Sequence, residues 1–167
     1  MAKLTILEVP DPRLHQVSQP IEYFDNNLDK LAFAMLATTS LENGVGLSAP
    51  QVGVLQRLFV MDLSLWGIKK AYVVANPEIV DVSDETVIRQ EACLSIPSTR
   101  GKGGTKIAVV RHRFIKLRYQ NGRGKQYQRW LGAKASWISQ HEVNHLNGVL
   151  ITDNLPQVSE QPIQLAC

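Results

Sequence analysis

The organisation of this chain follows from the stretch QHEVNHL at residues 140–146, near the C-terminus. His141 and His145 are four positions apart, so on a helix their side chains lie one turn apart on one face and can bind a single metal ion. Glu142 directly follows the first histidine, where it can contact a water molecule on that ion. Paired histidines at this spacing also occur on ordinary solvated helices, so the pattern alone leaves both interpretations open.

A second stretch supplies what a hydrolytic metal site still needs, which is a third protein ligand and an open position for water. The candidate ligand is Cys93, in the apolar segment QEACLSIP at residues 90–97. The only other cysteine is Cys167, which we expect to be a free thiol without a role. Two cysteines are too few for a disulfide framework, and a thiolate ligand persists best in a reducing compartment.

Length and composition indicate one domain over residues 1–167, with a short polar tail from about residue 154. No apolar run reaches the roughly 18 residues of a membrane span, and the N-terminus does not resemble a signal or transit peptide, so we expect a cytoplasmic protein. The net charge is +3, and basic residues concentrate between Arg100 and Lys134. We interpret them as a solvated pair of strands rather than a specific nucleic-acid surface.

Hydrophobic periodicity predicts one amphipathic helix over about residues 28–42, with capping candidates at 25–27, and a second helix over about 133–147. Strands are predicted at residues 58–62, 71–75, 78–82, 86–91, 107–110, 114–119 and 126–131. Asn76-Pro77 and Asn121-Gly122 are predicted turns. The expected fold class is α+β, with mostly antiparallel β-sheets packed around the C-terminal HExxH helix and one further N-terminal amphipathic helix.

The segment GVGLSAPQVG at residues 44–53 is rich in glycine and small residues. It does not resemble a phosphate-binding loop, because no Lys-Ser or Lys-Thr pair follows and the next element is a strand. Small residues here are better explained by a backbone that runs close to a ligand.

Three stretches together resemble peptide deformylase, the family that removes the formyl group from the N-terminal formyl-methionine of new polypeptides. They are GVGLSAPQ at residues 44–51, EACLS at 91–95 and QHEVNHLNG at 140–148. Their order and spacing also match the family, and the resemblance extends over nearly the whole chain.

The resemblance implies a metal site and the cofactor it holds. Cys93, His141 and His145 would bind one divalent ion and leave one position for water. The family works best with Fe²⁺ and often accepts Zn²⁺ or Ni²⁺, and imidazole and thiolate ligands suit all three ions.

The resemblance also implies the catalytic groups. Glu142 would take a proton from the metal-bound water and pass it to the departing amine, acting first as base and then as acid. Negative charge that develops on the formyl oxygen would be stabilised by the metal, the side-chain amide of Gln51 and the backbone N–H of Leu94. Without the motif context, the favoured interpretation of Gln51 is that it satisfies a buried backbone group.

Contacts to the substrate are assigned, again through the resemblance, to Val45, Gly46, Glu91, Arg100, Trp137 and Ile138. Gly46 and its neighbours would pair with the peptide as a short added strand, and Arg100 would help to hold it. Glu91 would lie close to the site and support it, with a surface position as the alternative. Val45, Trp137 and Ile138 would form the methionine pocket, with ordinary core packing as the alternative.

Three positions depart from the family pattern. Ala92 stands where the family usually has glycine, which would strain the backbone if a positive φ were required. Asn144 replaces the usual aspartate of the third motif, and Thr105 is aligned with an arginine that commonly partners it. We do not expect these changes to abolish activity, because they affect neither a metal ligand nor the acid/base.

The partners implied are N-formyl-methionyl nascent peptides, with no membrane and no specific nucleic acid, and we expect a monomer. Many bacterial members continue as a long helix after the third motif, which in some helps contact the ribosome; this chain stops soon after residue 156. Such a minimal form fits a phage or an unusual bacterium, and a phage protein would act in the host cytoplasm.

Two other functions are compatible with parts of the pattern. A metallopeptidase shares the HExxH arrangement, but Cys93, Gln51 and Leu94 weigh against it. A non-catalytic, metal-stapled module that binds peptide N-termini would have no use for Glu142 beside the metal.

Overall fold

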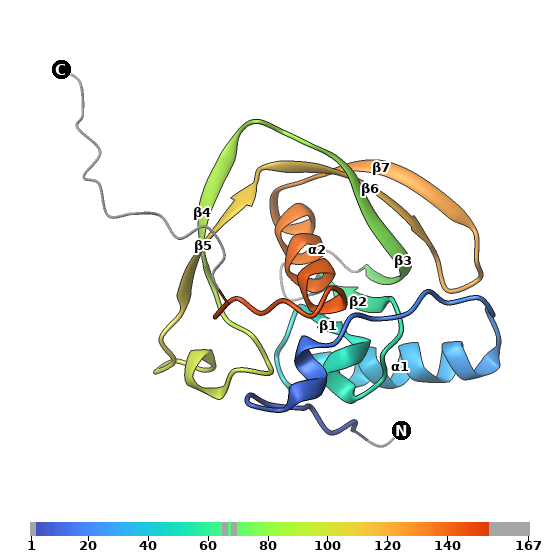
Figure 1. Ribbon diagram of the computed structural model, residues 1–167, viewed down its shortest axis with the longest axis horizontal. Helices are drawn as coiled ribbons and strands as arrows, with labels where there is room; N and C mark the ends of the chain where they lie inside the picture. Colours follow the sequence, from blue (N-terminus) through green and yellow to red (C-terminus); the bar gives the residue numbers. More distant parts are fainter. Residues whose placement is uncertain (1–2, 65–66, 68–69, 154–167) are drawn as a thin grey trace.

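The computed structural model describes residues 3–64, 67 and 70–153 (Figure 1). Among these residues, the α-helices are α1 (Asn26–Leu41) and α2 (Ala133–Leu146), and short 3-10 segments are η1 (Pro12–His15), η2 (Ala49–Val52) and η4 (Pro97–Thr99). The strands are β1 (Gly46–Ser48), β2 (Leu58–Asp62), β3 (Ala71–Val82), β4 (Thr86–Glu91), β5 (Ile107–His112), β6 (Phe114–Gln120) and β7 (Gln126–Gly132).

The strands form a five-stranded sheet in the order β1-β2-β3-β6-β7 and a separate β4–β5 ribbon, and every named pair of strands is antiparallel. Helix α2 lies near the middle of the molecule, between the ribbon and the larger sheet (Figure 1). The α+β class and the central C-terminal helix are therefore confirmed.

Strand β2 explains how the sheet holds two helices. Leu58 and Val60 pack in one buried cluster with α1, whereas Phe59 and Met61 point the other way, into a cluster with α2. Successive side chains of a strand point to opposite faces, so a strand that is apolar at every position is buried on both. The sheet at β2 thus separates the α1 core from the α2 core.

Helix α1 begins at a capping aspartate. Asp25 Oδ1 accepts hydrogen bonds from the backbone N–H groups of Asn27 at 2.9 Å and Leu28 at 3.0 Å. These donors have no partner within the helix, so the carboxylate satisfies two groups that the first turn leaves open. The buried face of α1 is part of the hydrophobic core, as an amphipathic helix requires.

Replacing Asp25 with Ala should lower the thermal midpoint of unfolding by about 2–4 °C, because the first turn loses its acceptor. Asp25→Asn is the matched control, since its amide oxygen can still accept these hydrogen bonds. Differential scanning fluorimetry of the three proteins measures the effect. An equal midpoint for Asp25→Ala and wild type would show that the cap does not stabilise the fold.

Helix α2 follows β7 directly and ends before Gly148, whose φ of 72° suits a residue without a side chain. Gln140 fastens the helix to β5. Its Oε1 accepts from the backbone N–H of His112 at 3.0 Å, and its Nε2 donates to the carbonyl of the same residue at 2.9 Å. This paired contact fixes the rotation and height of α2 against the ribbon.

Two expectations about strands were wrong. Residues 71–75 and 78–82 belong to the single strand β3, and Asn76-Pro77 forms a bulge in it rather than a turn. Asn76 has a φ of 48°, and its side chain exchanges two hydrogen bonds of 2.8 Å with the backbone of Ile21. Because Ala75 and Glu78, on either side of this dipeptide, both pair with β6, the predicted turn is a register shift within one strand. The three-residue β1 was not predicted.

No helix in the described part of the chain is long and apolar enough to cross a membrane. The predicted tail from residue 154 lies outside the described residues.

Candidate metal centre

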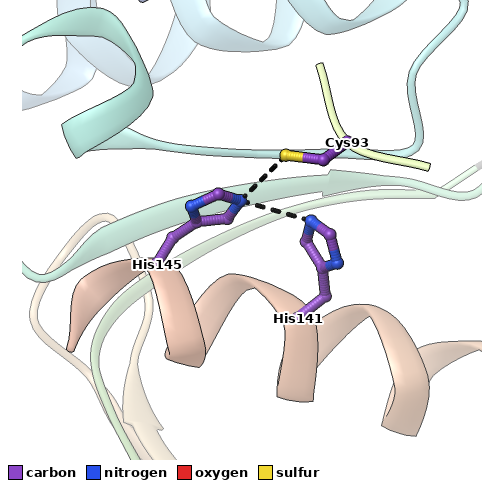
Figure 2. Close-up of side chains that lie close together, drawn as sticks. All are labelled: Cys93, His141 and His145. Carbon is purple, nitrogen blue, oxygen red and sulfur yellow. Dashed lines mark hydrogen bonds between the residues drawn. The ribbon is translucent and has the colours of Figure 1, made fainter. Parts of the chain in front are cut away.

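Three donor atoms converge between α2 and the segment after β4. Cys93 Sγ lies 3.2 Å from His145 Nε2, which lies 3.2 Å from His141 Nε2 (Figure 2). All three ligand atoms are within 4.8 Å of one another. The helix supplies both imidazoles from successive turns, as the spacing of the two histidines predicted. One thiolate and two imidazoles fit a divalent transition-metal ion that retains an open position.

A carboxylate next to Nδ1, the ring nitrogen that faces away from the other donors, sets the orientation of His141. Its Nδ1 lies 2.9 Å from Glu91 Oε2, so the ring proton belongs on Nδ1 and the lone pair of Nε2 faces the other donors. Burial alone would lower the pKa of His141, but the neighbouring Cys93 sulfur and the Glu91 carboxylate raise it to about 10. The same negative surroundings that favour an imidazolium would also favour a metal cation.

Glu91 is held in turn by a buried arginine. Arg111 donates from Nε to Oε1 at 2.8 Å and from Nη2 to Oε2 at 2.7 Å, a two-pronged ion pair. The side chains of Arg111 and Glu91 are only 4% and 12% exposed. Although burial favours the neutral form, Arg111 and His141 hold the pKa of Glu91 at about 2.

The role of Arg111 was missed, and one expectation is corrected. Arg111 was counted in a solvated basic run, whereas the structure places its buried guanidinium on Glu91. The alternation of β5 could have indicated that Arg111 is buried, because Arg111 faces the same side as the buried Val109. A basic residue on an apolar face needs a buried carboxylate.

Glu142 lies on the same helix, beside the donors and 3% exposed, with no hydrogen-bond partner for Oε2 among the described residues. Burial raises its pKa to about 7, against the lowering effects of His141 and Ser48. A bound cation would act in the opposite direction, because positive charge favours the carboxylate. Gly46 passes directly over this group: a Cβ there would overlap Glu142 Oε1 and come within 2.9 Å of Ile138.

Gln51 is buried, and its amide is fully oriented. Oε1 accepts from the backbone N–H and the hydroxyl of Ser48, both at 2.9 Å, while Nε2 donates to Ser95 Oγ at 3.1 Å and points at Cys93 Sγ at 3.6 Å. Gln51 therefore satisfies a buried backbone group, which was the alternative to a catalytic role. It also directs its N–H groups at the site. The backbone N–H of Leu94 has no acceptor among the described residues.

These groups open into one cleft of about 530 Å³ between α2, β4 and the β1 region. Among the residues assigned from the sequence, all but His145 line it: Val45, Gly46, Gln51, Glu91, Cys93, Leu94, Arg100, Trp137, Ile138, His141 and Glu142. His145 is 1% exposed and lies beneath the cleft. The structure thus brings the predicted residues together, while their individual roles stay predictions.

Two departures from the family pattern have simple structural accounts. Ala92 does not have a positive φ, so alanine fits its backbone without that strain. The Asn144 side chain makes no hydrogen bond to any described residue, so no described partner is left without the charge of the usual aspartate.

Comparison with known proteins agrees with this geometry. The family model described as Polypeptide deformylase matches residues 3–161. Peptide deformylase from Thermotoga petrophila is 41% identical over 145 residues, which cover 87% of this chain and 82% of that one. Peptide deformylase from Phenylobacterium zucineum is 41% identical over 163 residues, covering 96% of this chain and 92% of that one.

Solved structures show the same relationship. The crystal structure of peptide deformylase from Thermotoga maritima superimposes with a TM-score of 0.84 at 39% identity, covering 93% of this chain and 99% of that chain. A peptide deformylase from Synechococcus elongatus, solved in complex with actinonin, gives a TM-score of 0.83 at 31% identity, covering 95% and 82%. The match in sequence, fold and length shows that this chain belongs to the peptide deformylase family of hydrolases.

Proposed function

We propose that this protein hydrolyses the formyl group from the N-terminal formyl-methionine of new polypeptides, releasing formate and a peptide with a free amine. Family membership supports the reaction class. The observation that carries the proposal is the convergence of Cys93, His141 and His145 next to Glu142, at a cleft of about 530 Å³.

The three convergent residues would hold one divalent ion, for which we propose Fe²⁺, with Zn²⁺ and Ni²⁺ as ions that the same ligands accept. When bound, the ion supplies positive charge that makes water more nucleophilic and polarises a carbonyl oxygen. Glu91 keeps the His141 lone pair directed at the ion, and Arg111 keeps Glu91 charged.

Glu142 serves as the proton carrier. It accepts a proton from the attacking water, whose oxygen forms the new bond to the formyl carbon, and delivers that proton to the methionine nitrogen as the C–N bond breaks. Gln51 Nε2 and the Leu94 backbone N–H donate to the formyl oxygen as it gains negative charge. Both donors belong to buried or constrained segments, so little reorganisation is needed.

The substrate backbone would pair with β1, because β1 is the end strand of its sheet and no strand in the described part of the chain pairs with its second edge. Gly46 leaves room for this approach, since any side chain there would meet Glu142. Val45, Trp137 and Ile138 offer the apolar surface for the methionine side chain, and Arg100 lies at the same cleft. We further propose that the protein acts as a monomer in the cytoplasm, on chains emerging from the ribosome.

The test compares formyl-Met-Ala-Ser with acetyl-Met-Ala-Ser, using protein purified anaerobically with Fe²⁺ or Ni²⁺ and checked for metal content. We expect formate from the first peptide and no product from the second, because the acetyl group adds a methyl next to the reacting carbon. Mass spectrometry should show that the peptide bonds stay intact. Cleavage after methionine would instead indicate a metallopeptidase, and no product with one metal bound per chain would indicate a non-catalytic module.

A further inference from the structure

The basic run described from the sequence contains two contrasting groups in the structure. In the first group each guanidinium has a carboxylate partner, and the pairs are Arg100–Glu8, Arg111–Glu91, Arg113–Glu85 and Arg118–Glu78. The second group, Arg123, Lys125 and Arg129, is exposed. The side chains of these three residues make no ion pair or hydrogen bond within residues 3–64, 67 and 70–153, so their charges are available to a partner.

The second group lies on β7 and on the connection from β6 to β7, residues 121–125. This connection is on the opposite side of α2 from the β4–β5 ribbon (Figure 1), and no residue from 107 to 133 lines the cleft. Strand β7 is the end strand of its sheet, and no strand in the described part of the chain pairs with its second edge. The surface is therefore accessible and separate from the metal centre.

Trp130 adds a large aromatic ring to this end strand. Its side chain is 51% exposed, although tryptophan is on average highly buried. Lys116 lies opposite it on β6, with Nζ 5.9 Å from the centre of the ring. Positive charges alone would be explained as protection of an end strand against pairing with another chain, but an exposed tryptophan gives no such protection. Aromatic rings among basic side chains are typical of surfaces that bind single-stranded nucleic acid.

Negative charge is scarce around this surface. No Asp or Glu occurs between Arg113 and Lys134, although the net charge of the whole chain is only +3. The carboxylate of Asp29 in α1 approaches the connection, since a Cβ on Gly122 would lie 3.7 Å from its Oδ1. One carboxylate does not balance three unpaired cations, so the β6–β7 hairpin carries a positive potential.

We propose that β7 and the β6–β7 connection bind single-stranded RNA. Arg123, Lys125 and Arg129 bind phosphates, and Trp130 stacks against a base. Residues 125–130 extend over about 17 Å of strand, which suits a short stretch of nucleotides rather than one phosphate. Phosphate contacts and stacking do not distinguish sequences, so the binding is not sequence-specific. The choice of RNA over DNA rests on the proposed function, because new polypeptides are made where RNA is the abundant single-stranded polyanion.

The experiment measures fluorescence anisotropy of a labelled single-stranded RNA of about 12 nucleotides at several salt concentrations. We expect the logarithm of the binding constant to fall with the logarithm of salt concentration with a slope of about −2, because each phosphate contact on a single strand contributes about −0.7. Arg123→Gln, Lys125→Gln and Arg129→Gln should each weaken binding at low salt and make the slope shallower by about 0.7. Arg113→Gln is the matched control, because it removes a positive charge that Glu85 already pairs.

Stacking has a different signature from charge. Trp130→Ala should weaken binding by about fivefold or more at every salt concentration without changing the slope, and Trp130→Phe should keep most of the affinity because it keeps a ring. Asp29→Asn should tighten binding, since it removes the carboxylate beside Gly122. None of these variants should change kcat/KM for formyl-Met-Ala-Ser, because none of the residues lines the cleft.

A salt slope that is the same in wild type and in the Arg123, Lys125 and Arg129 variants would overturn the inference, as would an equal change in Arg113→Gln. Tighter binding of single-stranded DNA of the same sequence would contradict the assignment to RNA. Binding to phosphatidylglycerol vesicles without binding to RNA would assign the surface to a membrane instead. The anisotropy assay needs no turnover, so it decides RNA binding even if the absence of formate refutes the proposed function.

Discussion

Replacing Glu142 with Gln should lower kcat for formyl-Met-Ala-Ser by about 10²- to 10⁴-fold, the usual loss when a general acid–base group is removed. The carboxylate lies next to the metal donors in a buried position, where no other described carboxylate is free to substitute, because Glu91 is held by Arg111 and His141. Glutamine keeps the size of the side chain but cannot carry the proton. Steady-state formate release measures the effect.

Metal content and peptide binding must be retained for this result to bear on catalysis. Glu142 is not among the three convergent donors, so we expect Glu142→Gln to bind one ion per chain and to keep its affinity for Met-Ala-Ser. Glu22 is exposed and far from Glu142 in the sequence, so Glu22→Gln controls for the loss of one carboxylate. Turnover within a factor of two of wild type, with metal present, would remove Glu142 from the proton-transfer role.

The sequence was sufficient to predict that His141 and His145 are neighbours, because their geometry is local. Two histidines four positions apart need only a helix to become neighbours, and α2 extends from Ala133 to Leu146, close to the predicted 133–147. Cys93 is remote in sequence; it was the candidate third ligand among the residues, and the family resemblance implied the same role. The structure brings its sulfur within 3.2 Å of His145 Nε2.

The features that sequence reasoning missed depend on tertiary pairing. Asn76-Pro77 carries a genuine turn signal, but both flanks of this dipeptide pair with β6, and the sheet converts the turn to a bulge. Arg111 resembles a surface residue until β5 is placed against β4 and α2, because only that packing brings Glu91 within hydrogen-bond distance. Composition alone could not show which basic residue is buried.

Replacing Arg111 with Met should destabilise the protein by about 3–5 kcal/mol, because it leaves the Glu91 carboxylate buried without its main counter-charge. The pair is almost inaccessible to water, with Arg111 4% and Glu91 12% exposed, so solvent cannot compensate for the loss. The same change should weaken metal binding by about 10- to 100-fold, since Glu91 orients the His141 ring. Urea unfolding and metal titration measure the two effects.

The double variant Glu91→Gln/Arg111→Met separates the lost attraction from the stranded charge. Glutamine removes the negative charge but keeps an oxygen that can accept from His141 Nδ1, so the double variant should recover most of the stability lost in Arg111→Met. Arg113→Met is the matched control, because Arg113 pairs with Glu85 in solvent and its loss should cost little. If Arg111→Met and Arg113→Met destabilise the fold equally, or if the double variant is less stable than Arg111→Met, the ion pair does not support the metal centre through charge. Recovery of stability without recovery of metal affinity would instead show that the negative charge of Glu91 strengthens His141 as a ligand, beyond holding its ring in place.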